Sequence, residues 1–112
     1  MYKRGDIVLI PIPFTDLTSS KKRPVLILSA DQYNEKTEDI IVAAITSNLD
    51  NSAYTVKITQ SDLAEGNLLH GSCIRADKLY TLSQTIIIKK FGTVRSKVLV
   101  AVIDKILRIL GN

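Results

Sequence analysis

The sequence contains very little cysteine, no tryptophan and no long apolar run. Its single cysteine, Cys73, excludes an internal disulfide and a zinc site built from several cysteines. No stretch approaches the roughly 20 apolar residues that a membrane-spanning helix needs. The chain also starts without a signal-peptide pattern, so we expect a cytoplasmic protein that makes no membrane contact.

The bulk composition is that of one compact domain. With 112 residues, 46% hydrophobic and 23% charged, the chain is long enough to bury a real core, and we expect a single domain over residues 1–112. The formal net charge of +4 fits a polyanionic partner. Many proteins without such a partner are equally basic, so the charge alone identifies no function.

Apolar patterning predicts several short strands. Alternation or continuous apolar runs indicate strands over residues 6–12, 23–29, 39–47, 54–59, 67–70 and 72–77. The run 39–47 is apolar through its middle, as expected for a strand buried on both faces. Pro11 and Pro13 cannot donate to a sheet, so the first strand should end at an edge or leave the sheet. Turns, short helices or ambiguous segments are expected at 31–39, 48–53, 62–66, 80–82 and 84–88.

The end of the chain changes to a helical period. After Ser96, a plausible N-cap, apolar residues recur on one side of a helix that Gly111 would terminate. These apolar positions are Leu99, Val102, Ile103, Ile106, Leu107 and Leu110. Short strands followed by one helix predict a mainly β (α+β) fold, a small and strongly bent sheet or barrel with a C-terminal helix.

Polar residues interrupt the strands at three separate points. Arg23 precedes the second apolar run, Thr46 and Ser47 close the third, and Arg75 and Asp77 flank Ala76. An unpaired charge is costly to bury, so these strand ends are expected to share one wet surface. Two cations, a carboxylate and hydroxyl donors are the groups that would hold a phosphate for attack.

In these residues the chain resembles the MazF/PemK family, the toxins of bacterial type II toxin–antitoxin pairs. The matching blocks occur in the family's order and cover nearly the whole chain. They are Arg4-Gly5-Asp6, Arg23-Pro24-Val25-Leu26 with Ser29, Ala43-Ala44-Ile45-Thr46-Ser47, Ile74-Arg75-Ala76-Asp77 and the closing helix.

The resemblance implies an SH3-like barrel that forms a homodimer and cuts single-stranded RNA at short sequences, with neither metal nor cofactor. It also implies a cognate antitoxin, for which we expect an acidic, partly disordered segment, and DNA binding only through that antitoxin. The first loop, residues 14–22, departs from the family because it is shorter and lacks a histidine that some relatives carry. The RNA sequence preference and one proton-transfer group therefore stay open.

RNA cleavage without metal uses the 2′-hydroxyl as nucleophile and needs a base, an acid and cations for the phosphorane charge. Arg23 and Arg75 fit the cationic role because a guanidinium can hold two phosphate oxygens. Thr46 can donate a hydrogen bond to the same phosphate. Asp77 is either the base or the group that orients Arg75, since alternate residues of a strand point to one face.

Further residues are expected to bind the RNA strand around this phosphate. They are Ser19, Ser20, Lys21, Lys22 and Ser47. His70, the only histidine, would face away from Arg75 on an unbroken strand, although a bulge at Gly71 would reverse that expectation.

Simpler interpretations stay open for the same residues. Arg75 and Asp77 could form an ordinary surface ion pair, and Thr46 and Ser47 could only begin a turn. Two other functions are alternatives: a non-catalytic toxin of the same fold that inhibits a protein such as gyrase, and an inactive RNA-binding barrel. The barrel is the weaker alternative, because such modules use exposed aromatic platforms and this chain has only two Phe and four Tyr.

Overall fold

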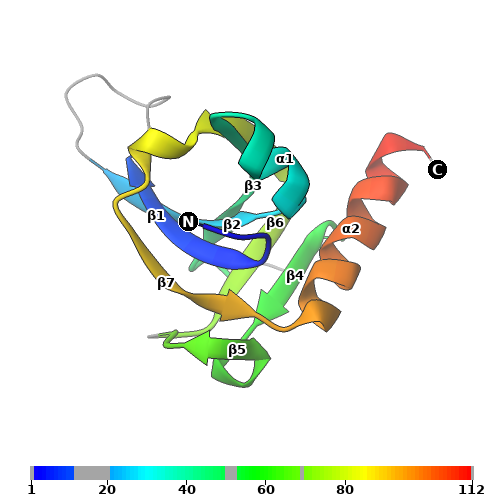
Figure 1. Ribbon diagram of the computed structural model, residues 1–112. Coiled ribbons are helices and arrows are strands. Elements are labelled where there is room, and N and C mark those ends of the chain that lie inside the picture. The colour runs from blue at the N-terminus through cyan, green and yellow to red at the C-terminus, as the bar shows by residue number, and fades with distance from the viewer. Residues whose placement is uncertain (1, 12–20, 50–52, 69, 112) are drawn as a thin grey trace.

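The computed structural model describes residues 2–11, 21–49, 53–68 and 70–111 (Figure 1). Within them, seven strands form one antiparallel sheet in the order β4-β6-β3-β2-β1-β7-β5. The strands are β1 (Asp6–Pro11), β2 (Lys22–Ile27), β3 (Asp39–Thr46), β4 (Thr55–Ile58), β5 (Leu63–Gly66), β6 (Ser72–Ser83) and β7 (Lys89–Val94). The sheet curls into a half-barrel with a helix along one side, which confirms the mainly β fold with a C-terminal helix (Figure 1).

The helices are α1 (Asp31–Lys36) and α2 (Ser96–Leu110), with short 3₁₀ turns η1 (Gln60–Asp62) and η2 (Gln84–Ile86). Helix α2 has the predicted extent, but Ser96 is its first helical residue and Arg95 occupies the N-cap without a side-chain hydrogen bond. Gly111 ends the helix with φ of 90°, a left-handed conformation that glycine adopts without a Cβ clash. No helix in the described ranges is long and apolar enough to cross a membrane.

The two faces of the sheet bury two separate apolar cores. One core lies between the sheet and α2, where Val98 and Val102 of the helix pack with Ala43 and Ile45. The other core lies on the opposite face and contains Ile40, Val42 and their neighbours on β1 and β2. Alternate residues of β3 thus enter different cores, which confirms that this strand is buried on both faces.

The sheet edge that contains β5 and β7 differs from the prediction. Residues 62–66 were expected to form a turn, but Leu63–Gly66 is a strand paired with β7, and β7 itself was not predicted. The backbones of Gly66 and Gly92 approach so closely that a Cβ at either position would overlap the other strand. The predicted strand at 67–70 is wrong, since its described residues belong to no strand.

The first strand behaves as its prolines require. Pro11 pairs with Lys22 of β2, whereas the pairing of β1 with β7 ends at Leu9. Pro11 therefore lies where β1 has a single neighbour, and its missing N–H costs no sheet hydrogen bond. Pro13 and residue 12 lie outside the described residues.

Candidate functional site

Strands β2 and β3 bring two of the predicted site residues to one face of the sheet. Their antiparallel register pairs Val25 with Ala44 and continues through Ile27. Arg23 lies two residues before Val25, and Thr46 lies two residues after Ala44. Directly opposite residues share a face, and alternate residues of a strand keep that face, so Arg23 and Thr46 point to the face of Val25 and Ala44.

Strand β6 adds Arg75 on the other side of β3. Thr46 pairs with Cys73, and Ala44 pairs with Arg75. Because Ala44 and Thr46 are alternate residues of one strand, they point to the same face, and so do the residues opposite them. The predicted residues Arg23, Thr46 and Arg75 therefore lie on one face of three neighbouring strands.

A bulge in β6 sets the position of the fourth predicted residue, Asp77. The partner in β6 changes from Leu79, opposite Ala43, to Arg75, opposite Ala44, so residues 76–78 have no partner in β3. The bulge is anchored on its other side, where the Ala76 N–H donates to the Tyr54 carbonyl at 3.0 Å. The bulge was not predicted, since the apolar pattern indicated a strand that stops at residue 77.

Arg75 and Asp77 form a two-pronged ion pair, as their spacing predicted. Nε of Arg75 donates to Oδ1 of Asp77 at 3.0 Å, and Nη2 donates to Oδ2 at 2.9 Å. These hydrogen bonds lower the pKa of the Asp77 carboxyl and raise the pKa of the Arg75 guanidinium. The carboxylate is consequently a weak base that fixes the direction of the guanidinium, whose side chain stays 35% exposed.

The other two groups are available to a ligand. The side chain of Arg23 is exposed and has no ion pair or hydrogen bond to any described residue. Oγ1 of Thr46 accepts a hydrogen bond from the Asn48 N–H at 3.1 Å, which fixes the hydroxyl oxygen and leaves its proton free to be donated. Both groups suit an anion that arrives from solvent.

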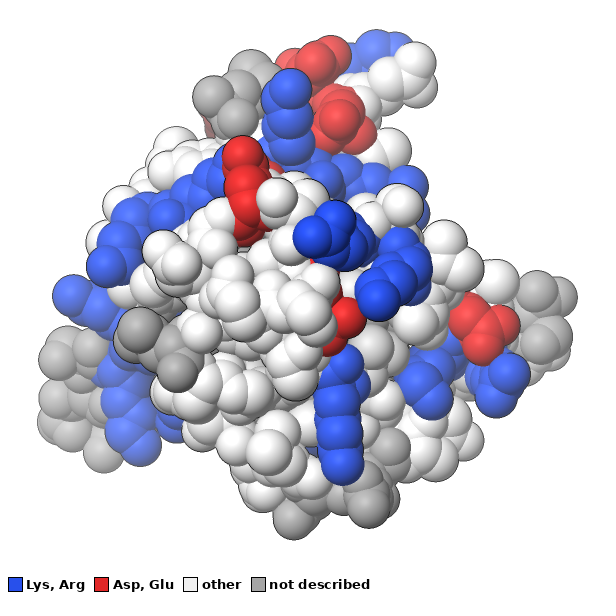
Figure 2. Space-filling view, turned by 90° about the horizontal axis from the view of Figure 1, so that it is seen from below, with Lys and Arg blue, Asp and Glu red and all other residues white. Residues whose placement is uncertain are grey.

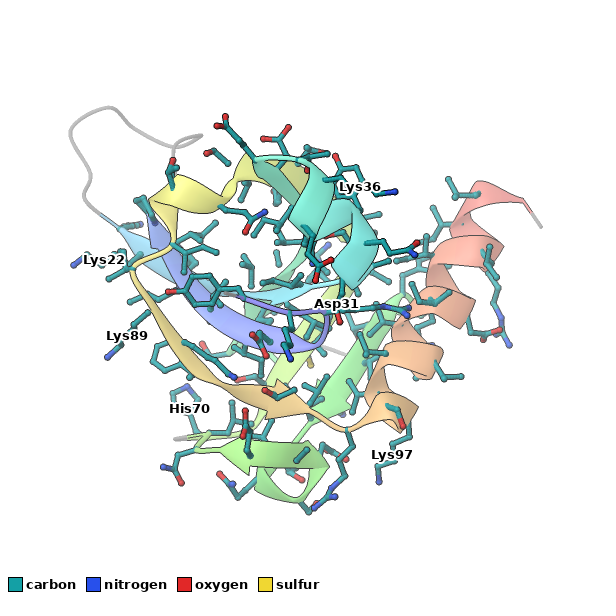
Figure 3. All side chains as sticks on the ribbon, viewed as in Figure 1. Lys22, Asp31, Lys36, His70, Lys89 and Lys97 are labelled. Atoms are coloured by element: carbon teal, nitrogen blue, oxygen red, sulfur yellow. The ribbon has the colours of Figure 1, made fainter. Side chains whose placement is uncertain are left out.

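The predicted RNA-binding residues extend this surface beyond the strand ends. Lys21, Lys22 and Ser47 are exposed. Ser19 and Ser20 lie outside the described residues. Lys and Arg side chains gather along the left edge of the molecule in Figure 2, the side on which Figure 3 labels Lys22 and Lys89.

His70 lies away from Arg75 and lines a small cavity on the α2 side of the sheet. It precedes β6, which begins at Ser72, so the strand alternation assumed in the sequence analysis does not extend to it. Cys73, which pairs with Thr46 across β3 and β6, is fully buried. The described part of the chain contains no cluster of three His, Cys, Asp or Glu side chains that could hold a metal ion.

Together, these features define a small curled β-sheet domain with a C-terminal helix and a group of cations and a hydroxyl at its strand ends. Residues 3–110 match the family of PemK-like, MazF-like toxins of type II toxin–antitoxin systems. The chain therefore belongs to this toxin family, as its sequence motifs predicted.

Solved structures share the fold at low sequence identity. One is an endoribonuclease in complex with its cognate antitoxin, from a mycobacterial species, with a TM-score of 0.81 and 21% sequence identity. The alignment covers 99% of this chain and 96% of that protein's chain. MazE-MazF from Deinococcus radiodurans has a TM-score of 0.80 and 21% identity, covering 98% and 96%. The Mycobacterium tuberculosis toxin MazF-mt6 has a TM-score of 0.75 and 21% identity, covering 94% and 95%. No curated protein sequence matches the chain at a significant level.

Proposed function

We propose that this toxin is a metal-independent endoribonuclease that cleaves single-stranded RNA at specific sequences. The observation that carries the proposal is the convergence of Arg23, Thr46 and Arg75 on one face of β2, β3 and β6. In this arrangement the Thr46 hydroxyl lies at the end of β3, with the Arg23 guanidinium on β2 and the Arg75 guanidinium on β6 to its two sides. A protein that only binds another protein has no need of such a set of phosphate-directed groups. The endoribonuclease description of a structural relative with 21% identity is consistent with this chemistry.

In the proposed reaction the 2′-hydroxyl of the substrate attacks the adjacent phosphorus. The 2′-hydroxyl gives up its proton, the P–O5′ bond breaks and the departing 5′-oxygen takes up a proton, leaving a 2′,3′-cyclic phosphate and a 5′-hydroxyl. Arg23 and Arg75 neutralise the charge of the phosphorane, and the Thr46 hydroxyl donates to one of its oxygens. Asp77 keeps Arg75 directed at the phosphate, because its carboxylate already accepts both hydrogen bonds.

Neighbouring groups would bind the strand on either side of the scissile bond. Lys21 and Lys22 supply positive charge for flanking phosphates, which attracts RNA in a salt-dependent way. Ser47, with Ser19 and Ser20 of the first loop, can donate hydrogen bonds to phosphate or ribose oxygens. These contacts position the strand without reading its sequence.

The proposed protein partners are a second copy of the chain and an antitoxin, both in the cytoplasm. An apolar groove of about 390 Å³ along α2, lined by Leu99, Val100, Ile103 and Leu107, supports a homodimer because Val100 is 69% exposed. Two of the similar structures are described as toxin–antitoxin complexes. An acidic, partly disordered antitoxin segment would compete with RNA for the basic strand ends, and any DNA binding would occur through the antitoxin.

Incubation of the purified protein with a long transcript in excess EDTA tests the proposal. We expect cleavage by the wild type, and losses of about 10²–10³-fold in Arg23→Ala and Arg75→Ala. Arg108→Ala is the matched control, because Asp104 on the same helix is the one ion-pair partner of Arg108 among the described residues. Intact RNA that is bound tightly would indicate an inactive RNA-binding barrel. Neither binding nor cleavage would favour a toxin with a protein target such as gyrase.

A further inference from the structure

A second concave feature lies near the proposed cleavage site, on the opposite face of the sheet. It is a cavity of about 120 Å³ with a mostly apolar lining that includes Pro24, Ile45 and Phe91. This volume exceeds that of several water molecules, which occupy about 30 Å³ each. Three described residues between β5 and β6, Asn67, Leu68 and His70, also line it.

Two residues that line the cavity are direct sequence neighbours of the phosphate-directed residues. Pro24 follows Arg23 and Ile45 precedes Thr46, so each neighbour points to the other face. Strand β2 begins at Lys22 and β3 ends at Thr46, so these residues lie at the edge of the sheet where its two faces meet. A chain that crosses these ends can have a phosphate on one face and a side group on the other.

Two lysines stand on the cavity's face of the sheet. Lys22 is opposite Pro11 of β1, and Lys89 is opposite Leu9, which also pairs with Pro24. Nζ of Lys89 lies 5.1 Å from the centre of the Phe91 ring, within the range of a cation–π contact. Figure 3 shows Lys22, Lys89 and His70 on the same side of the molecule.

We propose that this cavity binds one unpaired nucleobase of the RNA strand next to the scissile phosphate, and so selects the sequence that is cut. The inference rests on the proposed ribonuclease function and adds a base-recognition site to it. Phe91, Leu68 and Pro24 supply apolar surface for the base. Lys22 and Lys89 neutralise its flanking phosphates.

Two polar side chains at the mouth favour a base over an apolar side chain of an antitoxin. Within the described ranges, Asn67 and His70 have no side-chain hydrogen-bond partner. An amide and an imidazole offer both donors and acceptors, which match the edge of a nucleobase and have no role toward an aliphatic group. Binding an apolar residue there would leave these groups unused.

The test combines abasic substitutions in the RNA with substitutions in the cavity. The probes are oligonucleotides of a cleaved sequence with 2′-deoxyribose at the scissile nucleotide, each with one base removed in turn. For the wild type, removal of one base next to the scissile bond should weaken binding about tenfold, as loss of a stacked base does. In Phe91→Leu and Asn67→Ala that penalty should fall below about threefold, while penalties at other positions persist.

Controls separate this result from a loss of folding. Asn67 is exposed, so Asn67→Ala decides the question if Phe91→Leu unfolds. Tyr33→Leu, which removes an aromatic ring on α1, should keep the wild-type profile. Unchanged abasic profiles in both cavity variants overturn the inference, and weakened antitoxin binding with an unchanged RNA profile assigns the cavity to the antitoxin instead. Failure of the wild type to cut RNA in EDTA is the separate failure of the proposed function.

Discussion

The Arg75–Asp77 pair allows a decision between two roles for its carboxylate. If Asp77 were the general base, its replacement would cost about 10²–10⁴-fold in rate, whichever residue replaced it. If Asp77 orients Arg75, the cost depends on how many of the two hydrogen bonds remain. Asn at position 77 can still accept the bond from Nε, now 3.0 Å long, whereas Ala can accept neither.

We therefore expect kcat/KM to fall about tenfold in Asp77→Asn and about a hundredfold in Asp77→Ala. The larger loss reaches only the lower end of the loss of about 10²–10³-fold expected for removal of the cation itself. Stability should change little. The two side chains are 35% and 31% exposed, and pairs at such positions contribute about 0–1 kcal/mol. A large fall in the melting temperature of either Asp77 variant would mean that the ion pair stabilises the fold.

The assay is a double-mutant cycle measured by cleavage of a fluorogenic oligonucleotide. In an Arg75→Ala background, Asp77→Asn should have no further effect, because an orienting group acts only through the residue that it orients. A further loss of tenfold or more in that background would refute the orienting role and would instead support Asp77 as the general base.

The pH dependence gives an independent check with a definite sign. Hydrogen bonds from Arg75 lower the pKa of Asp77 below the usual value of about 3.9, so the carboxylate is charged at all pH values above that range. The stabilising effect of the pair is complete above the usual pKa and is lost as the pH falls through the lowered one. The rate profile of Asp77→Asn should thus have the wild-type shape between pH 5 and 9, and the loss of an acidic limb there would contradict it.

Three further predictions concern the fold and the basic strand ends. Val102→Ala, at a fully buried position of α2, should lower the free energy of unfolding by about 2 kcal/mol in urea titrations; a change near zero would mean that α2 does not anchor the core. Gly66→Ala should cost at least about 2 kcal/mol, because φ is 90° and the new Cβ meets the backbone of β7; a stable variant would contradict the β5–β7 pairing. Lys22→Ala should reduce the slope of log Kd for single-stranded RNA against log salt by about 0.7, while Lys36→Ala on α1 leaves it unchanged; equal slopes for both would exclude a phosphate contact by Lys22.

The sequence was most informative where one periodicity extended over many residues. Helix α2 repeats its apolar positions over 15 residues, and β3 is apolar over most of its 8 residues, so packing and propensity agree. The location of Arg23 and Thr46 followed from these boundaries, because a charge and a hydroxyl at strand ends indicate where burial stops. Their mutual approach could not be predicted, since it depends on which strands pair and in what register.

The edge of the sheet was hidden for a specific reason. Strand β7 begins with Lys89 and Lys90 and contains Gly92, residues that local propensity assigns to loops. Lys90 is explained by its contacts with Glu65 and the buried Asp6, at 2.8 and 3.4 Å. Gly92 is required by the close approach of β5. The local sequence around Lys90 and Gly92 therefore disfavours a strand. The contacts that favour a strand there come from residues distant in the sequence.

The bulge in β6 determines which face Arg75 occupies. Above the bulge, the even-numbered residues Tyr80 and Leu82 lie on the face opposite α2. Below it, the odd-numbered residues Arg75 and Cys73 lie on that same face, because the unpaired stretch 76–78 has an odd number of residues and reverses the alternation. Both stretches are equally strand-like in sequence, so the reversal leaves no local signal.

An unbulged strand would be incompatible with both the core and the site. If the upper register of β6 continued downward, Ala76 would lie opposite Thr46 and Asp77 opposite Ile45. The Asp77 carboxylate would then enter the apolar core beneath α2, where an unpaired charge is strongly unfavourable. The bulge avoids that burial, and the same displacement brings Arg75 onto the face of Thr46 with Asp77 as its partner. The constraint that protects the core therefore also assembles the candidate site.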